Sequence, residues 1–235
     1  VGIVNGIDTD VWDPAQDSNI KPYKTPAGKA ANKTALRKTF GLGKSDGPLC
    51  VLVSRLTEQK GIDLLLGAFP ALLATGGQLA LLGSGDPKLE VALLEAAASH
   101  PDIAVKIGYD EALSHRMMAG GDAILVPSRF EPCGLTQLYG LRYGTLPLVA
   151  LTGGLADTVI NASPAALSRD VATGVQVFPI TTQALANGFA RLGTLYKQPE
   201  VWKSMQHNAM KQPVGWGPSA KAYHAIYSSL TKAPG

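Results

Sequence analysis

The chain has 235 residues, of which 46% are hydrophobic and 17% charged, and its formal net charge at pH 7 is +3. A chain of this length and composition can bury a large apolar core, which excludes a predominantly disordered protein. The small positive charge also excludes a surface built for nucleic acid, because such domains carry a concentrated basic patch.

The chain lacks the usual signals for membranes, export and metals. No window of 18 apolar residues occurs, and residues 1–13 do not read as a charged and then apolar leader, so we expect no membrane contact and a cytoplasmic protein, or a plastid protein in a plant. Cys50 and Cys133 are too few for a disulfide framework, and we expect reduced thiols. No histidine shows ligand spacing with cysteine or carboxylate, so we expect no metal site. We also expect no resident cofactor.

The expected elements begin with a loop-rich approach over residues 1–48, broken by prolines and glycines, with one short helix at Ala31–Phe40. From residue 49 onward, short apolar runs alternate with longer helical stretches. Their uninterrupted apolar character is typical of strands that are covered on both faces. The expected strands are Leu49–Ser54, Gln78–Gly83, Ile103–Gly108, Asp122–Ser128, Leu146–Leu151 and Thr173–Phe178.

The stretches between the strands are amphipathic and predict helices, for example at Lys88–Ser99 and Leu113–Ala119. Pro70 interrupts the stretch Ile62–Ala74, which predicts a kink or two short helices. After the last strand the chain is expected to be helical, ending in Ser219–Leu230.

This alternation predicts an α/β fold, a Rossmann-like parallel sheet with helices on both faces. The sheet and its helices would occupy residues 49–180, and helices alone would follow in residues 181–235. Ligands of such sheets bind at the loops that leave the carboxyl ends of the strands. The candidate functional residues are therefore sought in those loops.

Two of these loops carry candidate phosphate ligands. Arg55 and Lys60 flank a turn after the first strand, and a guanidinium with an ammonium suits a diphosphate. The spacing alone favours two unrelated surface charges over this role. Gly83 and Gly85 stand at an expected strand-to-helix turn, where backbone can approach a phosphate. Lys88 replaces the third glycine of a dinucleotide fingerprint, which weakens a nicotinamide site.

The densest group of candidates follows the fourth strand. Glu131 lies on the loop, and the next helix is expected to begin at Gly134. The N–H groups of Gly134, Leu135 and Thr136 would then be free donors at the positive end of a helix, beside a carboxylate. On the preceding loop, Tyr109 follows a strand end, where its ring could stack on a base.

Five segments together resemble one family, the bacterial glycogen synthases and plant starch synthases. They are Asn5-Gly6-Ile7-Asp8 with Trp12, and the segments 54–61, 108–111, 127–137 and 152–159. The resemblance covers essentially the whole chain, and the segment around Glu131 is its most specific part. The bacterial form, which uses ADP-glucose, looks most similar.

The resemblance implies a retaining glucosyltransferase of the GT-B fold. Such an enzyme moves glucose from ADP-glucose to the non-reducing end of an α-1,4-glucan, and its C-terminal half binds the donor. Residues 1–235 would be that nucleotide-sugar-binding domain, without the N-terminal domain that holds the glucan acceptor. We therefore expect this chain to bind nucleotide but to be inactive alone, and to self-associate through an exposed interdomain face.

The resemblance also assigns roles to single residues. Arg55 and Lys60 match the cations that neutralise the diphosphate in place of a metal, and Glu131 matches the active-site carboxylate near the glucosyl ring. Tyr109 matches the ring that stacks on adenine. Tyr139 stands where many other retaining GT-B enzymes have a glutamate that contacts the ribose, which leaves the ribose contact unassigned.

The backbone donors of the segment 134–136 complete the implied set, with Leu135 and Thr136 offering their N–H groups to the distal phosphate. Two other functions remain open on the residues alone. One is a non-catalytic module that binds nucleotide or glucan. The other, less favoured, is a nicotinamide-dependent Rossmann oxidoreductase based on Gly83 and Gly85.

Overall fold

The computed structural model describes residues 2–231, and residue 1 and residues 232–235 lie outside the description. Six parallel strands form one sheet in the order β3-β2-β1-β4-β5-β6. The strands are β1 (Leu49–Leu56), β2 (Gln78–Gly85), β3 (Ile103–Ile107), β4 (Ala123–Val126), β5 (Leu146–Ala150) and β6 (Val175–Val177). The expected parallel sheet is confirmed, and the strands differ from their expected ranges only at the ends.

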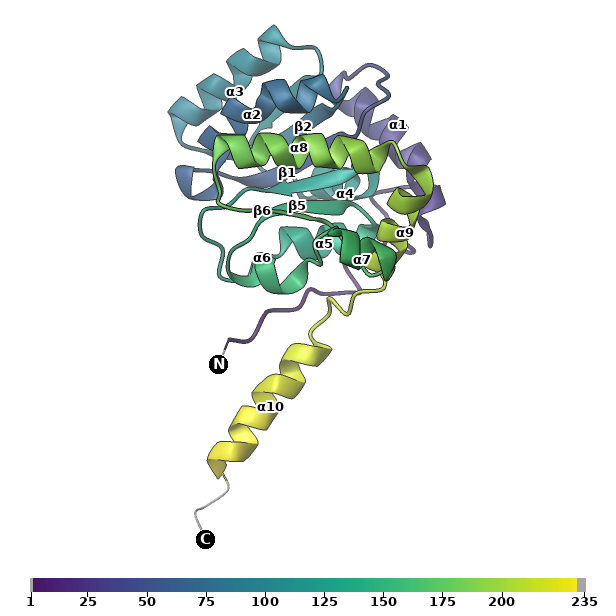
Figure 1. Ribbon diagram of the computed structural model, residues 1–235, viewed down its shortest axis with the longest axis vertical. Coiled ribbons are helices and arrows are strands. Elements are labelled where there is room, and N and C mark those ends of the chain that lie inside the picture. The colour runs from purple at the N-terminus through teal and green to yellow at the C-terminus, as the bar shows by residue number, and fades with distance from the viewer. Residues whose placement is uncertain (1, 232–235) are drawn as a thin grey trace.

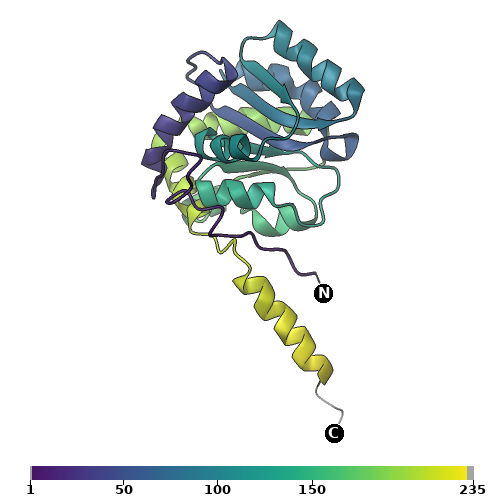
Figure 2. The ribbon, with the colours of Figure 1, turned by 180° about the vertical axis from the view of Figure 1, so that it is seen from behind.

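Helices cover both faces of the sheet, with α2 and α8 on one face and α4 and α5 on the other (Figures 1 and 2). The helices are α1 (Lys29–Phe40), α2 (Ile62–Ala74), α3 (Pro87–Ser99), α4 (Glu111–Gly120), α5 (Thr136–Tyr143), α6 (Gly153–Thr158), α7 (Pro164–Ser168), α8 (Thr182–Tyr196), α9 (Pro199–Met210) and α10 (Gly217–Thr231), with 3-10 turns η1 (Pro26–Gly28) and η2 (Glu58–Lys60). The arrangement is a doubly wound α/β fold.

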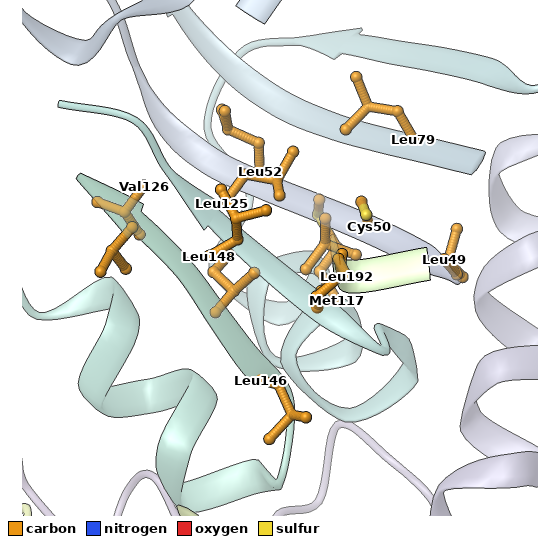
Figure 3. Packing of buried hydrophobic residues seen from close by; sticks show 14 of the residues in the cluster. Leu49, Cys50, Leu52, Leu79, Met117, Leu125, Val126, Leu146, Leu148 and Leu192 are labelled. Atoms are coloured by element: carbon orange, nitrogen blue, oxygen red, sulfur yellow. The ribbon is translucent and has the colours of Figure 1, made fainter. Parts of the chain in front are cut away.

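The core lies on both sides of the central strands, as the continuous apolar runs predict (Figure 3). The first four residues of β1 and all of β4 and β5 are buried. Cys50 lies inside this core, and burial raises the pKa of its thiol, so the thiol remains protonated. Both cysteines are free, as expected.

The strand order places a crevice at the centre of the sheet. From β1 the chain winds outward through β2 to β3, whereas from β4 it winds the other way through β5 to β6. The loops that follow β1 and β4 therefore diverge to opposite faces, although the two strands are neighbours. In doubly wound sheets this switch point is where ligands bind.

The helices depart from expectation at a few places. Residues 62–74 form one helix rather than two, and Pro70 lies on the exposed side of that helix, where a missing backbone donor costs least. The first helix starts at Lys29, two residues earlier than expected. The helices α6 and α7 are missed because six and five residues are too few to show a helical period.

A buried lysine links the N-terminal region to two helix ends. The Lys29 ammonium donates hydrogen bonds to the carbonyls of Met118 (3.2 Å) and Ala119 (2.9 Å) at the end of α4 and to the carbonyl of Tyr143 (3.1 Å) at the end of α5. It also donates to Thr145 Oγ1 at 2.7 Å. Burial lowers the pKa of Lys29 to about 7. A single side chain thus occupies the negative ends of both helices.

A second anchor lies further toward the N-terminus. Asp17 Oδ2 accepts a hydrogen bond from the Tyr143 hydroxyl (2.6 Å) and lies 2.7 Å from His115 Nδ1. Burial alone would raise the pKa of Asp17, but the hydrogen bonds from Tyr143 and the Asn19 backbone lower it below its usual range. The Trp12 ring stacks at 3.8 Å between centroids on the His115 ring. The N-terminal segment is therefore fastened to α4 and α5.

The last helix, α10, extends away from the rest of the molecule (Figures 1 and 2). It confirms the expected C-terminal helix, and the Ser219 hydroxyl at its start donates a hydrogen bond to the Val4 carbonyl. The side chains of Tyr223, Tyr227 and Leu230 are exposed along it. Such an apolar surface agrees with the expectation of association, which stays a prediction. No helix within residues 2–231 is both long and apolar enough to cross a membrane.

Candidate functional site

A pocket lies at the switch point of the sheet, outside the carboxyl ends of β1 and β4. Its floor is made by apolar residues of the two strands. The other residues that line it are Ser54, Lys60, Ser128, Glu131, Gly134, Leu135 and Thr136. The structure thus brings together five of the residues expected to act on the nucleotide sugar: Lys60, Glu131, Gly134, Leu135 and Thr136.

Lys60 and Glu131 face each other across this pocket. Lys60 lies at the end of η2, after β1, and its ammonium forms an ion pair with Glu131 Oε2 on the loop after β4. The Ser128 hydroxyl donates to the same carboxylate oxygen at 3.2 Å. The side chains of Lys60 and Glu131 are only 19% and 11% exposed, so water screens their attraction weakly. The sequence predicts both residues but not their pairing.

The start of α5 offers free backbone donors to the same pocket. The helix begins at Thr136, two residues later than expected, because Gly134 takes the left-handed conformation with φ +71°. Its N-cap, Leu135, has no side-chain acceptor, and its first turn has no acidic residue. Within the described chain, the N–H groups of Gly134, Leu135 and Thr136 donate no hydrogen bond. They form a site for an anion.

Hydrogen bonds between the loops after β1 and β4 hold Lys60 against Glu131. The Arg129 N–H donates to the Gln59 carbonyl at 2.8 Å, and the Arg129 guanidinium binds both carboxylate oxygens of Asp63 at 2.6 Å. Hydrogen bonding to Arg129 lowers the pKa of Asp63, which favours the ionised carboxylate that accepts these bonds. Sequence reasoning misses this bond because it joins residues 66 positions apart.

The structure places Arg55 differently from the expectation. Arg55 is not on a loop, because β1 continues through Leu56, where Arg55 lies opposite Ser84 of β2. Its side chain is exposed at the strand end and is not among the residues that line the pocket. The convergence of Arg55 and Lys60 on one anion stays a prediction.

The expectation that Gly83 and Gly85 form a strand-to-helix turn is wrong. Both residues lie within β2, and a Cβ atom would come within 2.1 Å of the Ser54 carbonyl oxygen at Gly83 and within 2.3 Å of the Leu56 carbonyl oxygen at Gly85. These glycines therefore let β1 and β2 approach closely. Their nucleotide-binding role stays a prediction without a contact that supports it.

The turn from β2 into α3 is also unsuited to a dinucleotide pyrophosphate. Asp86 caps α3 by accepting from the Lys88 N–H at 2.8 Å, and Glu90 accepts from the Gly85 N–H at 2.7 Å. The donors that a pyrophosphate would use are already satisfied by the chain's own carboxylates. The nicotinamide alternative has no support in this geometry.

The two candidate tyrosines are not among the residues that line the pocket. Tyr109 follows β3 and is 80% exposed, and Asp110 caps α4 by accepting from the Leu113 N–H at 2.8 Å. Tyr139 is half-buried and stacks on Trp12 with centroids 3.8 Å apart. Burial raises the pKa of the Tyr139 hydroxyl, and the nearby charges of Glu111 and Tyr109 add to the effect. Their contacts with a nucleotide stay predictions.

No cluster of three or more histidine, cysteine, aspartate or glutamate side chains within the described part of the chain could hold a metal ion. The charged groups of the pocket are a lysine and a glutamate, and the anion donors are backbone N–H groups. The pocket therefore presents one ammonium and a set of backbone N–H groups as its own donors to an anion.

Comparisons with known proteins identify the family of this chain. Residues 36–210 match the family described as Glycosyl transferases group 1. The chain is 71% identical over 231 residues to the glycogen synthase of Jannaschia sp. (strain CCS1), covering 98% of this chain and 49% of that protein. It is 63% identical over 229 residues to the glycogen synthase of Paracoccus denitrificans (strain Pd 1222), covering 97% and 48%.

A solved structure is similar over the same extent. The catalytic domain of Starch Synthase IV from Arabidopsis thaliana, bound to ADP and acarbose, matches with a TM-score of 0.89 and 37% identity, over 97% of this chain and 48% of that one. The chain thus spans about half the length of the proteins it matches. It belongs to the group 1 glycosyl transferases, has the fold of the C-terminal half of a GT-B enzyme, and resembles the glycogen and starch synthases among them.

Proposed function

We propose that this chain is the donor-binding half of a retaining α-1,4-glucosyltransferase, which moves glucose from ADP-glucose to the non-reducing end of glycogen or starch. The observation that carries the proposal is the pocket where the Lys60–Glu131 ion pair meets the uncapped start of α5. The similar starch synthase was solved with ADP bound. A nucleoside diphosphate fits the charge and the donors of this pocket.

The geometry suits the departure of a diphosphate. When the bond between glucose and diphosphate breaks, negative charge grows on the departing oxygen. The Lys60 ammonium and the N–H groups of Leu135 and Thr136 are held in place before the reaction, so they stabilise that charge without reorganising. Removal of one such contact typically costs about 3–4 kcal/mol in the transition state.

Glu131 has a different task in the proposal. Its carboxylate holds Lys60 in the pocket before the donor binds, and it lies beside the place where the glucosyl ring would be. There it stabilises positive charge that develops on the sugar. Arg55 would supply the second cation from the end of β1, and Tyr109 would stack on the adenine from the end of β3.

Calorimetric titration with ADP and with UDP tests the donor site. We expect the wild-type chain to bind ADP, and the Lys60→Ala and Tyr109→Ala variants to bind it at least about tenfold more weakly. The Lys60 change removes a cation from the diphosphate, whereas the Tyr109 change removes the surface on which the base stacks. Equal binding by all three proteins would overturn the site.

Glucan transfer is proposed to require residues beyond this chain, which spans half the length of its relatives. The glucan acceptor would bind to the other half of the enzyme. The exposed apolar face of this chain would pack against that half or against a second copy of this chain. Elongation of a glycogen primer with ADP-glucose measures this directly. We expect turnover at least about a thousandfold below that of a complete synthase, because the acceptor is not positioned. Comparable turnover would refute this part.

A further inference from the structure

Gln137 is a fully buried polar side chain directly behind the anion-binding segment. Its Nε2 lies at hydrogen-bond distance from the carbonyls of Cys133 (3.0 Å) and Gly134 (3.0 Å) and from Thr158 Oγ1 (3.2 Å). Its Oε1 is buried without a hydrogen-bond partner among the described residues. Gln137 does not line the pocket, so it acts on the segment from the protein side.

The two carbonyl bonds fix the direction of two peptide N–H groups. In a trans peptide unit the C=O and N–H bonds point in opposite directions. Because Gln137 holds the carbonyls of Cys133 and Gly134 on its own side, the N–H groups of Gly134 and Leu135 point away from it. Gly134 and Leu135 both line the pocket, which is consistent with N–H groups that face it. Two successive N–H groups aimed in one direction make a concave anion site.

The amide is itself fastened to a second element. Thr158 at the end of α6 accepts from Gln137, and its hydroxyl donates to the Gly154 carbonyl at 2.6 Å. The Gly154 N–H in turn lies 3.2 Å from the carbonyl oxygens of Glu131 and Pro132. Gln137 is thus one member of a closed set of contacts around the loop 131–135, rather than a side chain that fills space.

We propose that Gln137 is a positioning residue, which orients the N–H groups of Gly134 and Leu135 toward the distal phosphate of the nucleotide. The proposal rests on the donor site described above, and it states which side chain sets the orientation of the N–H groups in that site. The unpaired Oε1 indicates that the amide is retained for its donor nitrogen, since a buried unpaired oxygen is costly. Without the amide, nothing described on this side of the loop would hold both carbonyls.

The test compares ADP with AMP on this chain by calorimetry. AMP lacks the distal phosphate, so the oriented N–H groups serve ADP alone. We expect Gln137→Met, which keeps the volume but has no donor, to bind ADP about tenfold more weakly and to bind AMP as wild type does. A merely structural role would lower the thermal midpoint without changing this ADP-over-AMP preference in the folded protein.

The matched control is Gln206→Met. Gln206 is also buried, and its amide donates to the Gly144 carbonyl at 2.9 Å, just beyond the opposite end of α5. We expect Gln206→Met to lower stability while it leaves the ADP-over-AMP preference unchanged. An equal loss of preference in both variants would overturn the proposal, because the effect would then be general to α5.

The remaining outcomes are separable. If the wild-type chain binds no ADP, the donor site itself fails. If the wild type binds ADP and Gln137→Met keeps its preference for ADP over AMP, the positioning role alone fails. Should Gln137→Met not fold by circular dichroism, Gln137→Asn carries the test, since its amide is one methylene too short to hold both carbonyls. A folded Gln137→Asn variant with unchanged preference would also overturn the proposal.

Discussion

The helices α3 and α5 both start at the carboxyl edge of the same sheet, yet their first turns differ in charge. In α3, Asp86 caps the helix and Glu90 reaches back to the Gly85 N–H, so two carboxylates occupy the positive end. In α5, Leu135 occupies the N-cap position, and the first turn has no acidic residue. One helix start is thus satisfied within the chain, and the other is left for an anion from outside.

This difference in capping indicates which of the two glycine-containing turns is able to bind a phosphate. Both segments contain glycine near a strand end, so glycine content does not separate them. What separates them is whether a side chain of the protein already accepts the free N–H groups. A self-capped helix gains stability from its own carboxylates, whereas an uncapped helix gains it only when a ligand binds.

Giving α5 a cap of the α3 kind should have the largest effect. Leu135→Asp places a carboxylate beside the N–H groups that would hold the phosphate. We expect ADP binding to weaken about a hundredfold or more by like-charge repulsion, while the free energy of unfolding rises by up to about 1 kcal/mol. Calorimetry and urea unfolding measure the two effects. Leu135→Asn is the matched uncharged control, and an equal loss in it would show that charge is not the cause.

Releasing the loop of α5 should have a smaller effect. Arg129→Ala removes the bond to Asp63 that ties the loop after β4 to the first turn of α2. We expect ADP affinity to fall about fivefold, because Lys60 and the α5 donors lose their fixed spacing. In a double-mutant cycle, adding Asp63→Asn should cost little more. Additive losses would show that the two side chains act separately.

Freeing Lys60 should act in the opposite direction. In the ligand-free chain Glu131 neutralises Lys60, so Glu131→Gln leaves the ammonium available to the diphosphate. We expect ADP to bind about threefold more tightly, while glucan transfer by a complete enzyme that carries the same change is lost. Calorimetry on this chain decides the first expectation. Weaker ADP binding would mean that the carboxylate does not compete for Lys60.

Removing the cap of α3 should not change the affinity for the nucleotide. Asp86→Ala deletes the acceptor for the Lys88 N–H. We expect the free energy of unfolding to fall by about 1 kcal/mol in urea titrations, with ADP affinity unchanged within error. A change in ADP affinity would place α3 within the nucleotide site and reverse the comparison.

The sequence was sufficient for the sheet because the strands are apolar throughout, and burial of both faces is a local property of each run. It also identified Glu131 and the donors at residues 134–136, because a loop and a helix start are local features. The ends of the strands are harder to predict, because a polar residue such as Arg55 can continue a strand when it pairs with a neighbouring strand, here β2. The local sequence does not show which residues of the neighbouring strand are available for pairing.

Contacts between residues that are far apart in the chain could not be predicted from the sequence. Lys60 and Glu131 are 71 positions apart and meet only because β1 and β4 are neighbours in the sheet. Gln137 follows the donors by one residue, yet its role depends on burial and on Thr158 of α6. A glutamine at a helical position that faces the core is the one signal that could have indicated it, because an amide is seldom buried without a partner.

The buried ammonium of Lys29 shows that the contacts of the fold extend toward the N-terminus beyond the family match. The family match starts at residue 36, after this lysine and after Asp17 and Trp12. A chain cut at that boundary would keep every strand, but the carbonyls that Lys29 serves would lose their donor and His115 would lose its carboxylate. The segment that matches the family model is therefore smaller than the segment whose buried contacts hold α4 and α5, and the N-terminal stretch that carries these anchors lies outside the match.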